Sequence, residues 1–450
     1  MLDRAGQGRT GPDRSALGLW RRSRTLNPVI PQYALTTDQI DLSNFDFWVR
    51  PLAEREGAFH TLRTDAPLKF FAEPDMAGTG IEAGPGYWAV TKYADILEIS
   101  KNSALFCSGK GATSIADMPE FMNDFFGSMI NMDDPRHARM RKIVSAAFTP
   151  KMLKQIEDDV QRVAAEILDE ILAKGGGDFV IDVAARLPLK IICDMMGIPP
   201  SEYDTIFTRS NIILGSGDEE YQAQGDPNKI IEALLIAGGD LHGIVSELGA
   251  ARRKNPTDDL TSALVTASVD GEQLTDQELG SFFILLVVAG NETTRNAIAH
   301  GLDLLMMNPS QHALLKTDVE ARLPGAIEEI VRVAAPVVWM RRTATADTVI
   351  RGQNIKAGDK FLLYYWSANR DDEVFTDPFT FDITRSPNPH VGFGGPGPHF
   401  CLGAHLARRE IGVMWREIFN RAPGLVATSE AQRLRSSFIN GIKHINYEIH

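Results

Sequence analysis

Cys401 is the residue whose surroundings most clearly suggest chemistry. It lies in the segment GFGGPGPHFCLGAHLARRE, in which glycines precede it and a predicted helix follows it. Glycines allow backbone N–H groups to approach the sulfur, and the start of a helix directs its positive end toward it. Both features favour the thiolate, which is the form of cysteine that binds metals.

Three other interpretations apply to the same segment. The glycines from Gly392 to Gly397 spell G-x-G-x-x-G, but a dinucleotide site needs a strand before this pattern, and SPNPH precedes it here. His399 and His405 are suitable zinc ligands beside Cys401, although no second Cys/His cluster completes the site. An isolated cysteine is ordinarily a buried core thiol, and the local chemistry argues against that role.

Glu292 and Thr293 form a second candidate for chemistry. They follow the apolar run FFILLVVAG, and an adjacent acid and hydroxyl can deliver protons. The small residues Ala289 and Gly290 just before them leave room for a small molecule. The ordinary alternatives are that Thr293 hydrogen-bonds the carbonyl four residues earlier and that Glu292 lies on a solvated helix face.

A long helix is expected to position Glu292 and Thr293. Thr275 and Glu278 form the capping-box pattern, and the helix ends just before Pro309. About 33 residues give a helix on the order of 50 Å long. Because FFILLVVAG is apolar on every side, the middle of this helix must be buried.

Two shorter helices carry charged pairs. In DDPRHARMRKIVSAAF, Asp134 is the predicted N-cap with Pro135 at the first helical position, and the i, i+4 residues His137 and Arg141 share one face. The helix PGAIEEIVRVAA ends before a proline and carries the Glu-x-x-Arg pair Glu329 and Arg332. An i, i+3 pair of this kind is expected to anchor a local network rather than act in catalysis.

The chain of 450 residues is predicted to be mainly α-helical with a small β subdomain. Helical signals dominate from Asp134 onward, whereas strand-like sequence occurs at Tyr87–Val90 and again from Thr343 in VIRGQNIKAGDKFLLYYW. Residues 1–35 are rich in Arg, Gly and Pro and lack an apolar signal segment, so we expect a disordered leader. Residues 36–450 then form a single domain.

Composition excludes several classes of function. The net charge is −13 without a charged tract, so a nucleic-acid partner is not expected. The run FFILLVVA is far shorter than the roughly 20 residues of a membrane span, which predicts a soluble, cytoplasmic protein. Three cysteines cannot build a disulfide framework, and Cys193, in the apolar run LKIICDMMG, is expected to be a buried structural thiol.

These motifs together resemble those of the cytochrome P450 superfamily. FGGPGPHFCLG is similar to its haem-binding loop, and the other motifs follow in the expected order over residues 36–450: AGNETT at 289–294, Glu329 with Arg332, and His137 with Arg141. The F-G-G-x-G-x-H-x-C loop and A-G-N-E-T-T-R-N are also similar to those of bacterial sterol and methyl-branched-lipid hydroxylases. The resemblance implies the cytochrome P450 fold, with a long central helix over the haem.

The resemblance implies haem b with Cys401 as the axial ligand of its iron. A thiolate ligand pushes electron density toward the iron and favours O–O cleavage. The two haem carboxylates need cations or hydrogen-bond donors, and further residues pack on the ring. The implied cofactor-binding residues are Cys401, His137, Arg141, Arg342, His399, Phe393, Gly403 and Ala289, and the implied catalytic residues are Thr293 and Glu292.

The loop departs from the family pattern at Phe393. The aromatic residue ordinarily stands seven residues before the cysteine, whereas Phe393 stands eight before Cys401 and Gly394 occupies the usual place. The shielding of the thiolate by Phe393 is therefore left open. Gly403 retains its family position and allows a flat group to approach closely.

The expected reaction is insertion of one oxygen atom from O2 into a hydrophobic sterol, branched lipid or terpenoid. An apolar pocket predicts such a substrate, because it binds by burial of area with few orienting donors. The substrate-lining residues are expected to be Ala289, Val337 and Val338, with Trp339, Phe125, Phe126 and Met129 as further candidates.

Electrons are expected from a ferredoxin and its reductase, because the chain has no flavin or nicotinamide domain. Basic residues near the cysteine and on the His137 helix would meet the acidic ferredoxin, or they are scattered solvated charges: Arg136, Arg139, Lys142, Arg408 and Arg409. We expect a monomer. A peroxide-driven haem-thiolate enzyme and a haem-binding sensor are the alternative functions.

Overall fold

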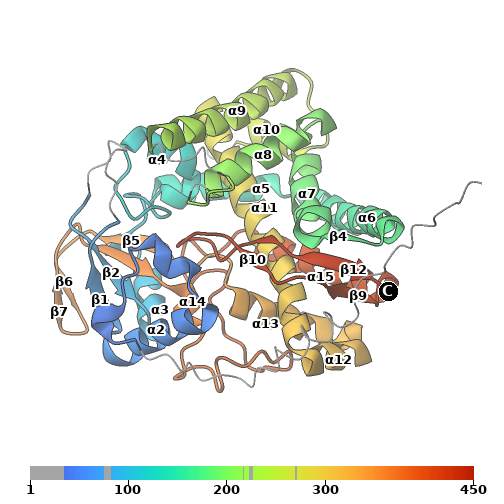
Figure 1. The fold of residues 1–450 in the computed structure, drawn as a ribbon. Coiled ribbons are helices and arrows are strands. Elements are labelled where there is room, and N and C mark those ends of the chain that lie inside the picture. Colours follow the sequence, from blue (N-terminus) through green and yellow to red (C-terminus); the bar gives the residue numbers. More distant parts are fainter. Residues whose placement is uncertain (1–34, 75–82, 216, 222–226, 269–270) are drawn as a thin grey trace, which may run out of the picture.

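The computed structural model describes residues 35–450 except 75–82, 216, 222–226 and 269–270 (Figure 1). The predicted leader, apart from residue 35, lies outside the described residues. The α-helices are α2 Leu52–Asp65, α3 Tyr93–Lys101, α4 Glu120–Gly127, α5 Arg136–Ala147, α6 Pro150–Lys174, α7 Arg186–Met196, α8 Tyr203–Leu214, α9 Pro227–Lys254, α10 Leu260–Thr266, α11 Asp276–Met307, α12 Pro309–Thr317, α13 Val319–Ala334, α14 Tyr365–Ala368 and α15 Ala404–Arg421.

Short strands complete the fold. They are β1 Leu68–Phe71, β2 Tyr87–Val90, β3 Phe106–Cys107, β4 Gly176–Asp178, β5 Met340–Ala344, β6 Thr348–Ile350, β7 Gln353–Ile355, β8 Lys360–Leu363, β9 Leu425–Ala427, β10 Gln432–Arg433, β11 Ile442–His444 and β12 Asn446–Ile449. The prediction of a mainly α-helical protein with a small β region is confirmed.

Helix α11 runs through the middle of the helical body and packs against α7, α9 and α15 (Figure 1). Its predicted start is confirmed: Oγ1 of Thr275 accepts the N–H of Glu278 at 3.1 Å, and Oε2 of Glu278 accepts the N–H of Thr275 at 2.9 Å. The helix ends at Met307, two residues before Pro309. Most of its side chains are buried, as the apolar run predicted.

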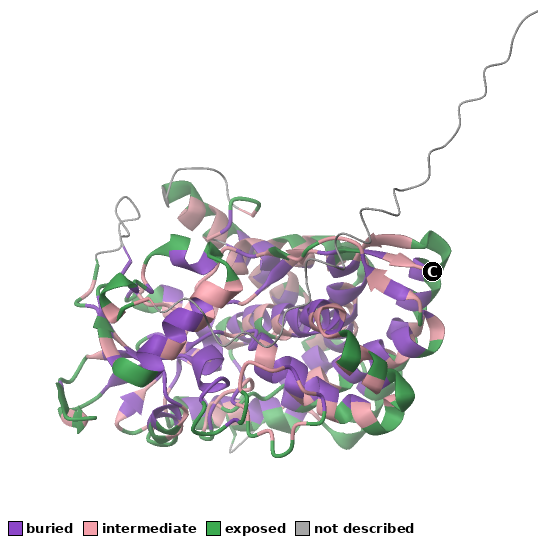
Figure 2. Ribbon diagram, turned by 60° about the horizontal axis from the view of Figure 1, so that its bottom comes forward, coloured by how far each residue is buried: buried purple, intermediate pink, exposed green. Residues whose placement is uncertain are grey.

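The apolar core divides between the helices and the sheet. One large cluster joins α6, α7, α11, α13 and α15, and two smaller clusters lie on the two sides of the five-stranded sheet. Figure 2 shows the buried residues concentrated along the interior helices, with exposed residues at the periphery. Cys193 belongs to the large cluster, and burial raises the pKa of its thiol to about 12, so the predicted structural thiol is confirmed.

The sheet predicted from Tyr87–Val90 and the region after Thr343 is confirmed. Its strand order is β1-β2-β8-β5-β3, with β2 and β8 parallel and the other pairs antiparallel. Strands β6 and β7 form a separate hairpin at one edge of the molecule (Figure 1). The β4-β12-β9 sheet and the β10–β11 pair were not predicted. The strand β4 is a short, glycine-containing segment that pairs with β12 from the far end of the chain, which no local pattern indicates.

The start of α5 and the absence of a membrane-spanning helix were both predicted from the sequence. The predicted boundary of α5 is off by one residue, because the helix begins at Arg136 with Pro135 as its N-cap. The side chain of Asp134 still caps the first turn, since its Oδ1 accepts the N–H of Ala138 at 3.1 Å. In the described part of the chain, no helix is both long and apolar enough to cross a bilayer.

Candidate active site

The loop before Cys401 needs its glycines. Gly394 and Gly397 have φ values of +89° and +144°, which favour glycine. A Cβ on Gly397 would also collide with the backbone carbonyl of Ser100 at the end of α3. The loop then leads to α15, which begins three residues after Cys401. No helix opens inside the G-x-G-x-x-G pattern, in agreement with the rejection of a dinucleotide site.

Opposing effects act on the Cys401 thiol. Desolvation is the largest and raises its pKa, although the residue is exposed by surface area. A hydrogen bond from the backbone of Gly403 and the positive charges of Arg141 and Arg408 oppose this effect, and the net pKa is raised. The hydrogen bond at Gly403 favours the thiolate, as expected from the sequence, but desolvation outweighs it. A bound metal cation deprotonates a coordinating thiol and would counter the desolvation.

Phe393 is tied to Cys401 despite the longer loop. The backbone N–H of Cys401 donates to the carbonyl of Phe393 at 3.1 Å. The half-buried ring of Phe393 lies 4.2 Å from the guanidinium carbon of Arg408, a cation–π distance. Arg408 also donates two hydrogen bonds to Glu328, at 2.6 and 2.8 Å. The extra residue thus leaves Phe393 beside the cysteine.

The structure brings together four residues predicted to bind haem carboxylates. The rings of His137 on α5 and His399 in the loop lie 4.2 Å apart between centroids. Desolvation, followed by the positive charges of Arg342, His137 and Arg141, lowers the pKa of His399 to about 3. Arg342 on β5 is 5% exposed. Residues from three separated segments therefore form one cluster, in which the two arginines carry the positive charge and the two histidines have lowered pKa values and serve as hydrogen-bond partners. We call it the cation cluster: His137, Arg141, Arg342 and His399.

The cation cluster is short of negative charge. Asp134 approaches Nδ1 of His137 at 3.5 Å, and among the described residues no ion pair joins Arg141 or Arg342 to a carboxylate. Their guanidinium groups instead donate to backbone carbonyls, Arg141 to Pro398 at 2.6 Å and Arg342 to Arg341 at 2.8 Å. A cluster of this kind fits a dianionic group, as the two haem carboxylates would be.

One face of α11 is accessible although the rest of the helix is buried. Ala289 is exposed, and Thr293 and Leu285 on the same face are half-buried. Oγ1 of Thr293 donates to the carbonyl of Ala289 at 2.7 Å, which is the ordinary helix bond anticipated from the sequence. The face leaves space next to Ala289. Gly290 does not contribute to it, because a Cβ there would lie 2.9 Å from Cδ1 of Ile192 on α7.

Gly290 thus permits close helix packing and is not room for a ligand, which corrects the interpretation from sequence. Gly403 behaves differently. A Cβ on Gly403 would meet no described atom within 4 Å, so the start of α15 is open on this side. Space at Gly403 and beside Ala289 fits a flat group that packs on both.

Glu292 is buried rather than solvated. It is 1% exposed and forms an ion pair with Arg295, and its Oε1 accepts from Nδ2 of Asn296 at 3.0 Å. Sequence reasoning missed Arg295, although the i, i+3 spacing from Glu292 was a usable signal. The prediction that Glu292 and Thr293 act together in proton delivery stays a prediction.

The predicted substrate-lining residues lie in different surroundings. Val338 and Trp339 are 3% and 2% exposed and belong to the core beside the sheet. Val337 is half-buried and pairs with Ile439 in a β-bridge. Ala289 is the exposed member of the set. The further candidates Phe125, Phe126 and Met129 are buried or half-buried within or against the helical core.

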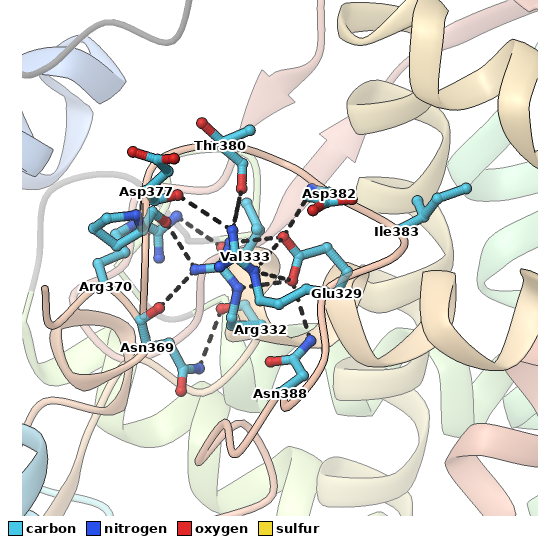
Figure 3. Close-up of polar contacts among 12 residues, drawn as sticks. Glu329, Arg332, Val333, Asn369, Arg370, Asp377, Thr380, Asp382, Ile383 and Asn388 are labelled. Atoms are coloured by element: carbon cyan, nitrogen blue, oxygen red, sulfur yellow. Dashed lines mark hydrogen bonds and ion pairs between the residues drawn. The ribbon is translucent and has the colours of Figure 1, made fainter. Parts of the chain in front are cut away.

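The Glu329–Arg332 pair is confirmed as the centre of a structural network. Both side chains are fully buried and joined by hydrogen bonds of 2.8 and 2.7 Å (Figure 3). Arg332 also donates to the carbonyls of Asn369 and Pro378, and Glu329 accepts from Asn388 at 3.1 Å. The pair therefore ties α13 to the long segment that leads to the cysteine loop.

The zinc interpretation finds no support. In residues 35–450, outside the undescribed gaps, no three side chains of His, Cys, Asp or Glu are placed to bind a metal ion together.

Comparison with known proteins agrees with this geometry. The family model described as cytochrome P450 matches residues 240–421. The methyl-branched lipid omega-hydroxylase of Mycobacterium tuberculosis is 49% identical over 407 residues, which cover 90% of this chain and 93% of that protein. The steroid C26-monooxygenase of the same species is 41% identical over 402 residues, covering 88% of each chain.

Solved structures are also similar to this chain over most of its length. A cytochrome P450 of Mycobacterium marinum in complex with pseudoionone has a TM-score of 0.86 and 40% identity, covering 92% of this chain and 99% of that chain. A protein of Bacillus megaterium in complex with corticosterone has a TM-score of 0.75 and 31% identity, covering 90% and 100%. The similarity therefore extends over nearly the whole described chain.

Proposed function

This chain belongs to the cytochrome P450 family and is a monooxygenase, and from that premise we propose that it uses haem b and O2 to hydroxylate a methyl-branched lipid or a sterol side chain. The cation cluster beside the Cys401 loop is the observation that carries the proposal. The names of the relatives at 49% and 41% identity support the substrate class.

Each part of the site has a role in holding the haem. Cys401 would bind the iron, and the cation cluster would bind the two carboxylates, for which its members have donors to spare. Gly403, Ala289 and Phe393 pack on the ring. When bound, haem supplies the reductive activation of O2. The protein contributes the charge that anchors the group and the apolar surface that excludes water from it.

Proton delivery falls to Thr293 and Glu292. The Thr293 hydroxyl donates to the carbonyl of Ala289, and rotation about χ1 turns it toward the open face of α11. Glu292, one residue away, replaces the proton that Thr293 gives up. Both groups would have a role because the reaction consumes protons.

The substrate lies against apolar side chains. Ala289 offers an exposed surface and Val337 a half-buried one, whereas Val338 is 3% exposed and lies in the core beside the sheet. Burial of area gives roughly 25 cal/mol per Å2, so a branched hydrocarbon gains affinity without a polar anchor. This agrees with the expected hydrophobic substrate.

A ferredoxin, reduced by its reductase, is the proposed electron donor to a monomeric enzyme. A recess of about 340 Å3 between α5 and the cysteine loop is lined in part by Arg141, Lys142 and Pro398. Phe400 and Leu402 are 41% and 39% exposed on either side of Cys401. An apolar centre with a basic margin suits a small acidic protein.

Two of the basic residues predicted to meet the ferredoxin form ion pairs within the chain. Arg139 pairs with Glu272 and Glu278, and Arg408 pairs with Glu328, so their charges are partly neutralised within the chain. Arg409 is exposed and remains the better candidate for contact with the donor.

Two measurements test the proposed function. The reduced carbon-monoxide complex should show the red-shifted Soret band of thiolate ligation, and Cys401→Ala should lose it. Turnover with ferredoxin, reductase, O2 and a methyl-branched fatty acid or sterol should give the hydroxylated product. Product formed only with peroxide would indicate a peroxide-driven enzyme, and a thiolate spectrum without any turnover would indicate a sensor.

A further inference from the structure

Arg55 on α2 is a buried cation without a partner of its own. It is 7% exposed, and its Nε atom is buried without a hydrogen-bond partner. Among the described residues, its guanidinium makes no hydrogen bond and no ion pair. Desolvation is the largest effect on Arg55 and lowers its pKa to about 10, which leaves it charged at neutral pH. A buried charge needs an opposite charge or hydrogen bonds, and Arg55 has neither.

Two further arginines lie near Arg55. The guanidinium carbons of Arg55 and Arg370 lie 5.9 and 4.4 Å from the centre of the Trp366 ring, so one indole packs against both side chains. Arg433 on β10 is close enough for its charge to lower the pKa of Arg55 further. The side chain of Arg433 is 27% exposed, so solvent reaches these residues from β10. We call the three residues the arginine group: Arg55, Arg370 and Arg433.

Carboxylates neutralise only two of these three charges. Glu56 accepts from Nε of Arg370 at 3.0 Å, and Asp303 on α11 accepts from Nη2 of Arg433 at 2.7 Å. His300 lies 3.4 Å from Nη1 of Arg433, but desolvation lowers its pKa to about 3, so it is neutral. In the described part of the chain, no other carboxylate forms an ion pair with the arginine group. One positive charge is therefore left over, at Arg55.

We propose that the arginine group binds a small oxyanion, either inorganic phosphate or the phosphate of a monoester, with Arg55 as its main ligand. The five N–H donors of a guanidinium form a planar fork that matches phosphate oxygens, and the described residues use none of those of Arg55. The three arginines come from different elements. A phosphate has oxygens on all sides to accept from them, whereas a carboxylate accepts at one edge.

This site shares no residue with the cation cluster and does not depend on the proposed function. The bound ion joins α2, near the start of the described chain, to β10, near its end. Nη2 of Arg370 also donates to the carbonyl of Val333 on α13 at 2.8 Å, next to the Glu329–Arg332 network (Figure 3). An anion that relieves the repulsion among the arginines therefore stabilises the contacts between these elements, and its binding is measurable as a gain in stability.

Thermal unfolding of the holoenzyme tests the site, because the haem carboxylates then occupy the cation cluster. Sodium phosphate at about 100 times its Kd should raise the Tm by about 3 °C over sodium chloride of equal ionic strength and pH. Methyl phosphate in a third sample distinguishes the two sources of the ligand. A rise with both compounds indicates that a monoester fits, and a rise with phosphate alone indicates the free ion. Equal Tm values in all three salts would overturn the proposal.

Arg55→Gln tests the residue on which the proposal depends. In chloride this variant should unfold at the same temperature as the parent or slightly above it, because an unpaired buried charge has been removed. It should show no rise in phosphate. The control Arg50→Gln, at an exposed arginine just before α2, should keep the full rise. A rise of parental size in Arg55→Gln would show that Arg55 does not bind the ion.

Equilibrium dialysis with labelled phosphate measures binding without reference to stability. The parent holoenzyme should bind one ion per chain through Arg55, and Arg55→Gln should bind it at least about tenfold more weakly, as expected for the loss of a charge-assisted hydrogen bond. Arg55→Lys keeps the charge without the planar fork and should fall between the two. Equal affinity in the parent and Arg55→Gln would contradict the assignment.

Discussion

The guanidinium carbon of Arg408 lies 4.2 Å from the ring centroid of Phe393, and the same guanidinium donates two hydrogen bonds to Glu328. This contact joins α13 to α15 across the loop that carries Cys401. Desolvation raises the pKa of Glu328, but hydrogen bonds from Arg408 and His390 outweigh it and lower that pKa to about 2. The loop is therefore held by an ion pair with a pH dependence that can be measured.

Arg408→Gln should lower the free energy of unfolding of the holoenzyme by about 1–2 kcal/mol at pH 7, because it removes a charge-assisted pair and a cation–π contact. The folded-state pKa of Glu328 lies below its unfolded value, so the pair stabilises above about pH 4.5, and this stabilisation is lost as the pH falls toward 2. Urea unfolding at several pH values should show the difference between variant and parent shrinking in acid.

Arg409→Gln is the matched control for this prediction, since Arg409 is the exposed neighbour. It should change the free energy of unfolding by less than about 0.5 kcal/mol at any pH. A loss in Arg408→Gln that stays constant from pH 7 to pH 3 would show that the ion pair with Glu328 is not the cause.

Thr293→Ala should consume reductant and O2 while it forms little product, because the hydroxyl next to the open face of α11 is gone. Thr293→Ser keeps the hydroxyl and should retain most of the product yield. The measurement is product formed per reductant oxidised, in parallel with O2 uptake. Unchanged coupling in the Ala variant would rule out Thr293 as a proton donor.

Glu410→Gln should stabilise the protein at alkaline pH. Glu410 on α15 is 2% exposed, and burial raises the pKa of its carboxyl to about 8. The folded state therefore holds a proton that the unfolded state releases from about pH 4.5 upward, and stability falls as the pH rises to 8. Removing the group should recover about 2–4 kcal/mol at pH 8 and little at pH 4.5.

Unfolding by urea at the two pH values checks this prediction for Glu410. The exposed Glu157 on α6 gives the control Glu157→Gln, which should leave the pH dependence unchanged. A Glu410→Gln variant as pH-sensitive as the parent would show that Glu410 does not titrate with a raised pKa.

Glu329→Ala should destabilise the protein by about 3–5 kcal/mol, because it leaves the guanidinium of Arg332 buried without its carboxylate. Replacing both members, Glu329→Leu with Arg332→Met, should cost less than the single change if the unpaired charge is the main penalty. Thermal unfolding and haem retention of the three proteins provide the comparison. A double variant that is less stable than Glu329→Ala would assign the loss to the wider network instead.

Local signals in the sequence were enough to predict several helices and strands. The capping box at Thr275 and the proline at 309 defined α11 to within a residue or two, because helix ends depend on nearby side chains. The strand Tyr87–Val90 followed from its composition. The motif around Cys401 identified the family. Its glycines Gly394 and Gly397 are required by the positive φ values of the loop backbone.

Only the tertiary structure decided the burial, the charge pairing and the free space on which the chemistry of the site depends. Gly290 serves packing against Ile192, and Glu292 is held by Arg295, which reaches Asn211 84 residues away in the sequence. The Cys401 loop raises the pKa of its own thiol through desolvation. Burial, charge pairing and free space depend on segments that fold together from distant parts of the chain, and no local pattern records which segments meet.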